Sequence, residues 1–350
     1  MALVADPSTQ RSACTALDAL LEVLHDVIDQ YLPLIMERLS GLLETAPLNV
    51  KAVVTGAIGS AAHASKDQFT QYFQDTMHRM QHFLVLTGEG EETELRGITM
   101  DTVGTFAEAV GKDLFRPYYE PLMKQAFQGI ELGSARLREC SFLFFGVMAG
   151  VFGEEFAPSL PAVVPSLIAS LKQEESGQET QPREFHRRQR SGFKLTYIVT
   201  YTTVTVNDVS AFTSGSSPAN PISVEDGTGS EEVEIDLEKA LEVNSAVAVE
   251  KEIAADTLGT LFAATREHFL PFVEQTALEL IALLSHYYEG IRKSATDSLL
   301  KVIRTFYDLS GQPEWQPGAS VVRHSHREVH STLMLAISTA TLESECQGPD

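Results

Sequence analysis

Residues 136–172 have the sequence RLRECSFLFFGVMAGVFGEEFAPSLPAVVPSLIASLK, which predicts two apolar helices joined by a sharp turn. In the second helix, apolar residues recur at spacings of three and four, the period of one helix face: Leu160, Val163, Val164, Leu167, Ile168 and Leu171. Pro158 lies near the first turn of that helix, where its missing N–H costs little. Gly146 in the first helix allows a neighbour to approach closely. One such pair cannot bury both of its apolar sides, so it needs similar pairs beside it.

The turn between the two helices recurs along the chain. It occurs as Tyr31-Leu32-Pro33, Phe69-Thr70-Gln71, Phe115-Arg116-Pro117, Phe156-Ala157-Pro158 and Phe269-Leu270-Pro271, whose third positions are 38, 46, 41 and 113 residues apart. The first three steps lie at or near the period of about 40–47 residues that HEAT and armadillo arrays have, and the last is one period plus about 70 residues. A second landmark agrees, because glycines precede four of these turns by 12 or 13 residues: Gly59, Gly104, Gly146 and Gly259.

The predicted fold is therefore all-α, an α-solenoid (superhelix) of about six HEAT-type antiparallel helix pairs interrupted by a long low-order loop. HEAT is favoured over armadillo because no short third helix precedes each pair. Residues 1–175 are expected to hold four pairs, residues 176–242 the insertion, and residues 243–345 two more pairs, the last irregular. The first helix is expected near residues 12–27. Arg96, Arg138 and Arg292 each stand early in the first helix of a pair.

Residues 176–242 break the helical pattern. A basic patch (183–194) is followed by a β-branched and aromatic run (195–206) and a Ser/Gly/Pro-rich linker (211–223). The run fits an isolated hairpin, a loop of low order, or sequence foreign to the ancestral fold, and we favour the loop. An acidic tract follows, which we expect to be disordered by self-repulsion until a cation meets it. Its acids are Glu225, Asp226, Glu231, Glu232, Glu234, Asp236, Glu238 and Glu242.

Composition narrows the classes of partner. The net charge of −22 and the pI near 4.8 argue against nucleic acid and favour basic partners. The three cysteines, Cys14, Cys140 and Cys346, have no metal-type spacing, so we expect free thiols in a reducing compartment. No uninterrupted apolar run reaches the roughly 18 residues of a membrane span, and the N-terminus lacks a basic region followed by an apolar core. We therefore expect a soluble intracellular protein without membrane insertion.

No catalytic or cofactor signature is found in the sequence. Phosphate-binding, nucleophile-elbow and zinc-binding motifs are all absent, so we expect no enzyme activity, no cofactor and no metal. His324, His326 and His330 form a histidine cluster, but no carboxylate or thiolate stands at a ligand spacing beside them. Glu154 and Glu155 could form an acid/base pair, yet acids at a helix turn more often serve the helix N-terminus.

Three long segments resemble the middle repeats of the importin-β family of karyopherins, of the importin-4 class. They are ELRGITMDTVGTFAEAVGKDLFRPYYEPLMKQAF (94–127), RLRECSFLFFGVMAGVFGEEFAP (136–158) and NSAVAVEKEIAADTLGTLFAATREHFLPFVEQ (244–275). The resemblance covers roughly residues 31–175 and 235–318, and it rests on continuous similarity rather than on one short motif. Family members are about three times this length, so the chain resembles an internal fragment in which most of the Ran-GTP site is missing.

The resemblance implies a nuclear import receptor. Such a receptor carries basic cargo, including ribosomal proteins and histones, shuttles between cytoplasm and nucleus, passes the nuclear pore on Phe-Gly nucleoporins and responds to Ran-GTP. In this family the second helices line the concave face, and here they and the turns offer acids that could bind cargo together with the acidic tract. These acids are Asp75, Glu120, Glu131, Glu154, Glu274 and Glu279. Each one taken alone also fits a solvated helix face.

Two other classes of function remain open from the sequence. A HEAT-repeat scaffold for complex assembly with no transport role would hold folded partners that are not notably basic. An enzyme would require turnover without a copurifying protein, which the missing motifs disfavour.

Overall fold

The computed structural model of the 350-residue chain describes residues 6–21, 28–173 and 230–309, with side chains in the last range from residue 246 onward. The basic patch, the β-branched run, the histidine cluster, Cys346, Glu225 and Asp226 lie outside the described residues. By its contacts the chain divides into two units, residues 1–175 with 245–350 and residues 176–244. The described part of the second unit is the helical segment 230–244.

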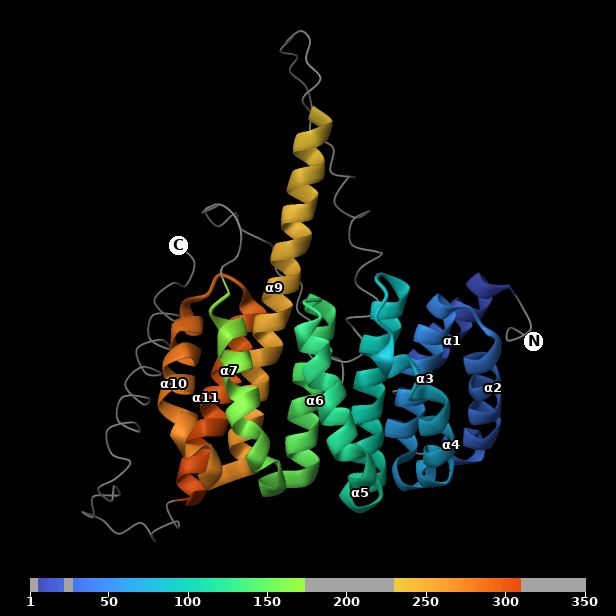
Figure 1. Ribbon diagram of the computed structural model, residues 1–350, viewed down its shortest axis with the longest axis horizontal. Coiled ribbons are helices and arrows are strands. Elements are labelled where there is room, and N and C mark those ends of the chain that lie inside the picture. Colours follow the sequence, from blue (N-terminus) through green and yellow to red (C-terminus); the bar gives the residue numbers. More distant parts are fainter. Residues whose placement is uncertain (1–5, 22–27, 174–229, 310–350) are drawn as a thin grey trace, which may run out of the picture. The chain divides into compact units, whose positions relative to one another are not determined.

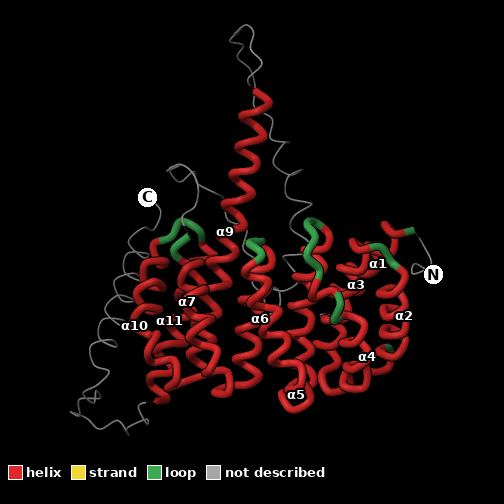
Figure 2. Tube along the Cα trace, viewed as in Figure 1, coloured by secondary structure: helices red, strands yellow, loops and turns green. Residues whose placement is uncertain are grey.

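The described residues form helices and short connections, with no strand among them, which confirms the all-α class (Figure 2). Antiparallel pairs follow one another along the chain (Figure 1). They are α1 (Pro7–Leu21) with α2 (Leu32–Thr45), α3 (Leu48–Ser65) with α4 (Thr70–Met80), the two halves of α5 (Glu91–Glu131), α6 (Ala135–Phe152) with α7 (Leu160–Leu171), and α9 (Ser230–Thr265) with α10 (Leu270–Ala282), before α11 (Glu289–Leu309).

Two helix boundaries differ from the sequence-based expectation. Helix α1 begins at Pro7 rather than near residue 12, because the Asp6 carboxylate accepts hydrogen bonds from the N–H groups of Ser8 and Thr9 and so caps the helix. Helix α9 begins at Ser230, so residues 230–242 are helical where a low-order segment was expected. Glu, Leu, Ala and Lys in that segment are strong helix formers, and the helix continues directly into the apolar segment after it.

The stretch Ala135–Leu171 is long and apolar enough to cross a membrane by composition alone. In the structure it is not one straight helix, because the chain turns between α6 and α7 in the 3₁₀ segment Gly153–Ser159. Of its most apolar window, 56% is buried inside the protein. Burial against neighbouring helices therefore accounts for its apolar character.

Four of the five recurring turns place an aromatic ring in the core, whereas Tyr31 at the first turn is 50% exposed. The rings of Phe69, Phe115, Phe156 and Phe269 are all fully buried. In four of the pairs the backbone has a positive φ where the first helix ends, at Lys66 (46°), Gly111 (75°), Gly153 (60°) and Arg266 (51°). Helix α5 is thus two helices that meet at Gly111, as the sequence predicts. The aromatic landmark marks the point where the chain reverses and covers the core.

The glycine landmark marks contacts between neighbouring first helices. At three of these contacts a hydroxyl donates a hydrogen bond to a carbonyl oxygen four residues before the glycine: Thr102 to Thr55 (3.2 Å), Thr257 to Phe142 (3.3 Å) and Ser298 to Ala255 (2.7 Å). The glycines there are Gly59, Gly146 and Gly259, and each lies against the hydroxyl-bearing residue. At the contact of α5 with α6, Gly104 instead meets Phe144 and Val147. A shared spacing thus reflects a shared way of packing.

The early arginines join one pair to the next. Arg96 donates from Nη1 to the carbonyl oxygen of Leu86 at 2.8 Å, and Arg292 donates to that of His286 at 2.6 Å. Arg138 donates to the carbonyl oxygen of Gly133 at 2.9 Å. Each guanidinium therefore holds the connection that leads into its own helix, where carbonyl groups have no helical partner.

Candidate functional site

A groove of about 520 Å³ lies between the second helices α2 and α4; we call it the first groove. Helix α2 contributes Pro33, Met36, Glu37, Ser40, Gly41 and Glu44, and helix α4 contributes Gln71, Tyr72, Asp75, Thr76 and Arg79. Both helices bury one face in the core, through residues such as Leu39 and Phe73, so their polar faces line the groove. Gly41 leaves its floor open, since nothing lies within 4 Å of the place a Cβ would take.

Three carboxylates and one guanidinium set the charge of the first groove. Arg79 forms ion pairs with Glu44 of α2 and, through Nε at 2.8 Å, with Asp75 one turn earlier on α4. Glu37, one heptad before Glu44, is exposed and has no ion pair among the described residues. The groove is therefore acidic overall, with one carboxylate free and two already paired.

A second groove, of about 540 Å³, lies between the turn before α7 and the turn before α10. Its lining is largely apolar, with two carboxylates and one imidazole at the edge: Ala157, Pro158, Pro161, Pro271, Phe272, Glu154, Glu155 and His268. Glu155 accepts hydrogen bonds from Arg116 at 2.6 Å and Lys112 at 3.1 Å. These bonds lower the pKa of Glu155 to about 2. Glu154 is the carboxylate of this groove that has no ion pair among the described residues.

The structure separates the six acids predicted to bind cargo. Asp75 lines the first groove and Glu154 the second. Glu279 forms an ion pair with Lys172 at 2.8 Å, which joins α10 to the end of α7. The other three are exposed but line neither groove: Glu120, Glu131 and Glu274. Within the acidic tract, Glu231, Glu232, Glu234, Asp236, Glu238 and Glu242 belong to α9.

Sequence reasoning missed two acids of the first groove, Glu37 and Glu44. They stand seven residues apart, the spacing that places two residues on one helix face, and this signal could have found them. The same spacing did not indicate that Arg79 of the next pair would reach Glu44, because that contact depends on how α2 and α4 pack.

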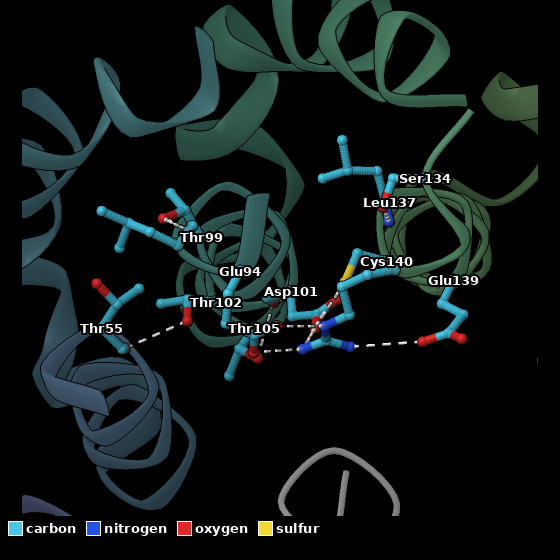
Figure 3. A network of polar contacts seen from close by, with 12 residues as sticks. Thr55, Glu94, Thr99, Asp101, Thr102, Thr105, Ser134, Leu137, Glu139 and Cys140 are labelled. Carbon is cyan, nitrogen blue, oxygen red and sulfur yellow. Dashed lines mark hydrogen bonds and ion pairs between the residues drawn. The ribbon is translucent and has the colours of Figure 1, made fainter. Parts of the chain in front are cut away.

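A buried ionic cluster lies between α5 and α6 (Figure 3). Arg136 of α6 lies 3.3 Å from Glu94, 3.8 Å from Asp101 and 3.8 Å from Glu139. Burial raises the pKa of Asp101 to about 6 and that of Glu139 to about 7. Cys140 donates from Sγ to Asp101 Oδ2 at 3.3 Å.

This cluster is suited to holding two helices together rather than to catalysis. Burial raises the pKa of Cys140 well above its usual value, and a neutral buried thiol is a poor nucleophile and a poor metal ligand. Over the residues that the structure describes, no group of three or more His, Cys, Asp or Glu side chains could hold a metal ion. The resident cation here is the Arg136 guanidinium.

A second ionic contact links α6 to α9 across the insertion. Arg138 donates to both carboxylate oxygens of Glu250, at 3.0 and 2.8 Å, and Ser170 of α7 donates to the same carboxylate at 2.8 Å. The Glu250 side chain is only 2% exposed. Three helices that lie on both sides of residues 174–229 in the sequence therefore meet at one buried carboxylate.

No protein-family model matches the chain. The chain is 43% identical over 315 residues to a Schizosaccharomyces pombe protein named probable importin subunit beta-4, which covers 88% of this chain and 26% of the relative. It is 26% identical over 293 residues to importin-4 of Mus musculus, covering 82% of this chain and 24% of the relative. The chain thus spans about a quarter of the length of these curated relatives.

A solved structure confirms the HEAT-type fold. A crystal structure of importin beta aligns with a TM-score of 0.59 at 16% sequence identity, over 96% of this chain and 34% of that chain. The α-solenoid of helix pairs predicted from the sequence is therefore the architecture of this chain.

Proposed function

The chain belongs to the importin-β family of karyopherins, and we propose that it is part of a nuclear import receptor that binds basic protein cargo along its second helices. Ribosomal proteins and histones have the cargo chemistry that an acidic chain favours. Ran-GTP and Phe-Gly nucleoporins are proposed partners of the whole receptor. The proposed location is the cytoplasm, the nucleus and the nuclear pore.

The first groove is the observation that carries this proposal. It combines an unpaired carboxylate, Glu37, with apolar contact area from Pro33 and Tyr72. A Lys or Arg side chain has the matching shape and charge, because its stem packs on apolar surface while its head meets a carboxylate. Tyr72 adds a ring face that can attract a cation.

The second groove offers a related but less charged surface. Its prolines and Phe272 accept apolar side chains, and Glu154 can receive one cation at the edge. Cargo segments with basic residues beside apolar ones would therefore suit either groove, through several weak interactions. Such contacts are screened by salt, so the proposed binding weakens as ionic strength rises.

The experiment measures the Kd of a fluorescent Lys/Arg-rich peptide for the 350-residue chain between low and physiological salt. We expect Glu37→Gln with Glu44→Gln to weaken binding roughly three- to tenfold, since each exposed ion pair contributes about 0.2–1 kcal/mol. The matched control is Asp297→Asn with Asp308→Asn on α11, which removes the same charge from exposed positions of a first helix. Salt-insensitive binding, or equal loss in the control, would contradict cargo binding at the first groove.

The scaffold function is the second candidate, and one observation favours it. Asp75 and Glu279 already hold cations of this chain, which reduces the negative charge available to cargo. A scaffold predicts that partners captured by the chain are not notably basic and that capture survives the Glu37→Gln, Glu44→Gln change. If the wild type and the Glu37→Gln, Glu44→Gln variant capture the same partners, and these partners are not notably basic, the scaffold is favoured over transport.

A further inference from the structure

The first groove contains a cation of its own. Arg79 projects from α4 and pairs with Glu44 on the opposite wall and with Asp75 on its own helix. Its side chain is 30% exposed, so the guanidinium lies at the groove surface rather than in the core. Both paired carboxylates line the same groove as the free Glu37. The groove is therefore partly neutralised by a residue of the chain itself.

We infer that Arg79 is a built-in competitor of the cargo cation, so that a Lys or Arg side chain enters the first groove by displacing the Arg79 guanidinium from Glu44 and Asp75. This inference rests on the proposed function and concerns its regulation. The incoming cation meets Glu37 first, because that carboxylate has no ion pair among the described residues. It then exchanges with Arg79, which remains attached through its flexible stem.

Exchange of one cation for another has two physical consequences. The groove is never left as three unbalanced carboxylates, which would repel one another when no ligand is bound. The affinity for any single basic residue stays low, because each new ion pair is formed at the expense of an existing one. Low affinity per residue makes binding depend on several basic residues acting together.

A purely structural role is the alternative, since the pair between Arg79 and Glu44 also ties α2 to α4. The two roles predict opposite changes in binding. If Arg79 competes with the ligand, its removal frees two carboxylates and strengthens binding. If it only holds the helices in place, its removal loosens the groove and weakens binding or leaves it unchanged.

The test compares the wild-type chain with Arg79→Met, which removes the charge and keeps an apolar stem. The matched control is Arg304→Met, the same substitution at an exposed position of α11. The probe is the Lys/Arg-rich peptide, with a Gln-substituted peptide of equal length beside it. We expect Arg79→Met to bind the basic peptide roughly two- to fivefold more tightly, the range given by one exposed ion pair. The affinity should also fall more steeply with salt, because more carboxylates take part.

Thermal unfolding of each variant provides the second measurement. Tighter binding by Arg79→Met, with Arg304→Met equal to the wild type, supports the inference even if Arg79→Met unfolds at a lower temperature. If the wild type binds the basic peptide and Arg79→Met binds it no more tightly, the inference is overturned while the proposed function stands. Equal strengthening by both variants overturns it as well, because net charge alone would explain the gain. If neither the wild type nor Arg79→Met binds the basic peptide, the inference and the proposed function both fail.

Discussion

Ser298 of α11 donates a 2.7 Å hydrogen bond to the carbonyl oxygen of Ala255, and its side chain lies directly against Gly259 of α9. A Cβ atom at Gly259 would lie 2.5 Å from Ser298 Oγ and 2.8 Å from Ser298 Cα. The second of these contacts is with backbone, which cannot rotate away. The two first helices are therefore as close as they are because residue 259 has no side chain.

This contact predicts that Gly259→Ala destabilises the chain. Overpacking a tight contact costs about 1–3 kcal/mol, while the better helix propensity of Ala returns about 1 kcal/mol. We expect a net loss of up to about 2 kcal/mol, measured from the urea midpoint. Gly146→Ala is the matched control, because a Cβ there would lie 3.7 Å from Thr257, an ordinary contact distance. It should be neutral or stabilising, and equal loss in both variants would contradict the packing argument.

The positive φ angles at Lys66 and Arg266 predict a stabilising substitution. These residues occupy the place where equivalent turns have Gly111 and Gly153, and a non-glycine residue there is strained. Lys66→Gly and Arg266→Gly should each raise stability by about 1 kcal/mol. Gly153→Ala, which introduces the same strain, should lower it by a similar amount. Urea unfolding followed by circular dichroism measures all three, and stabilisation by Gly153→Ala would refute the explanation.

The sequence was informative where one residue serves the same purpose in every repeat. Phe69, Phe115, Phe156 and Phe269 fill equivalent core positions, so their spacing predicted the helix pairs. The glycine spacing was predictive for a similar reason, although only some of those glycines are required for packing. Gly146 was expected to allow close approach, but the tight contact is at Gly259.

The candidate site was harder to predict because it depends on contacts between repeats. Only one of the three carboxylates in the first groove, Asp75, was identified, and the pairing of Arg79 with Glu44 has no sequence signal. Glu279 was predicted to face cargo, but its partner Lys172 comes from the preceding pair. Ion pairs between helices depend on their relative register, which hydrophobic periodicity does not determine.

The buried cluster around Arg136 predicts that stability falls as pH rises. Because the folded pKa of Glu139 is about 7, above its ordinary value of 4.5, the folded chain keeps a proton that the unfolded chain has released. This penalty is absent below pH 4.5, grows as pH rises and is complete above pH 7. Asp101, with a pKa of about 6, acts in the same direction.

Glu139→Gln tests this dependence. Gln cannot ionise, so we expect the variant to be more stable than the wild type at pH 8, by about 3 kcal/mol, and equal to it near pH 4.5. Urea midpoints across this pH range provide the measurement. A constant difference between the two proteins at all pH values would show that Glu139 does not titrate in this range.

The buried carboxylate of Glu250 predicts a large cost when Arg138 alone is removed. Arg138→Met leaves a charge that is 2% exposed without its cation, which costs about 3–5 kcal/mol. Adding Glu250→Met should recover most of that loss, because two apolar side chains can replace a buried pair. Lys301→Met, which breaks the more exposed pair with Asp256, is the control and should cost less than about 1 kcal/mol. The measurement is the urea midpoint of the wild type, Arg138→Met, the double variant and Lys301→Met. A double variant as unstable as Arg138→Met would show that the loss of stability comes from Arg138 packing and not from an unpaired charge.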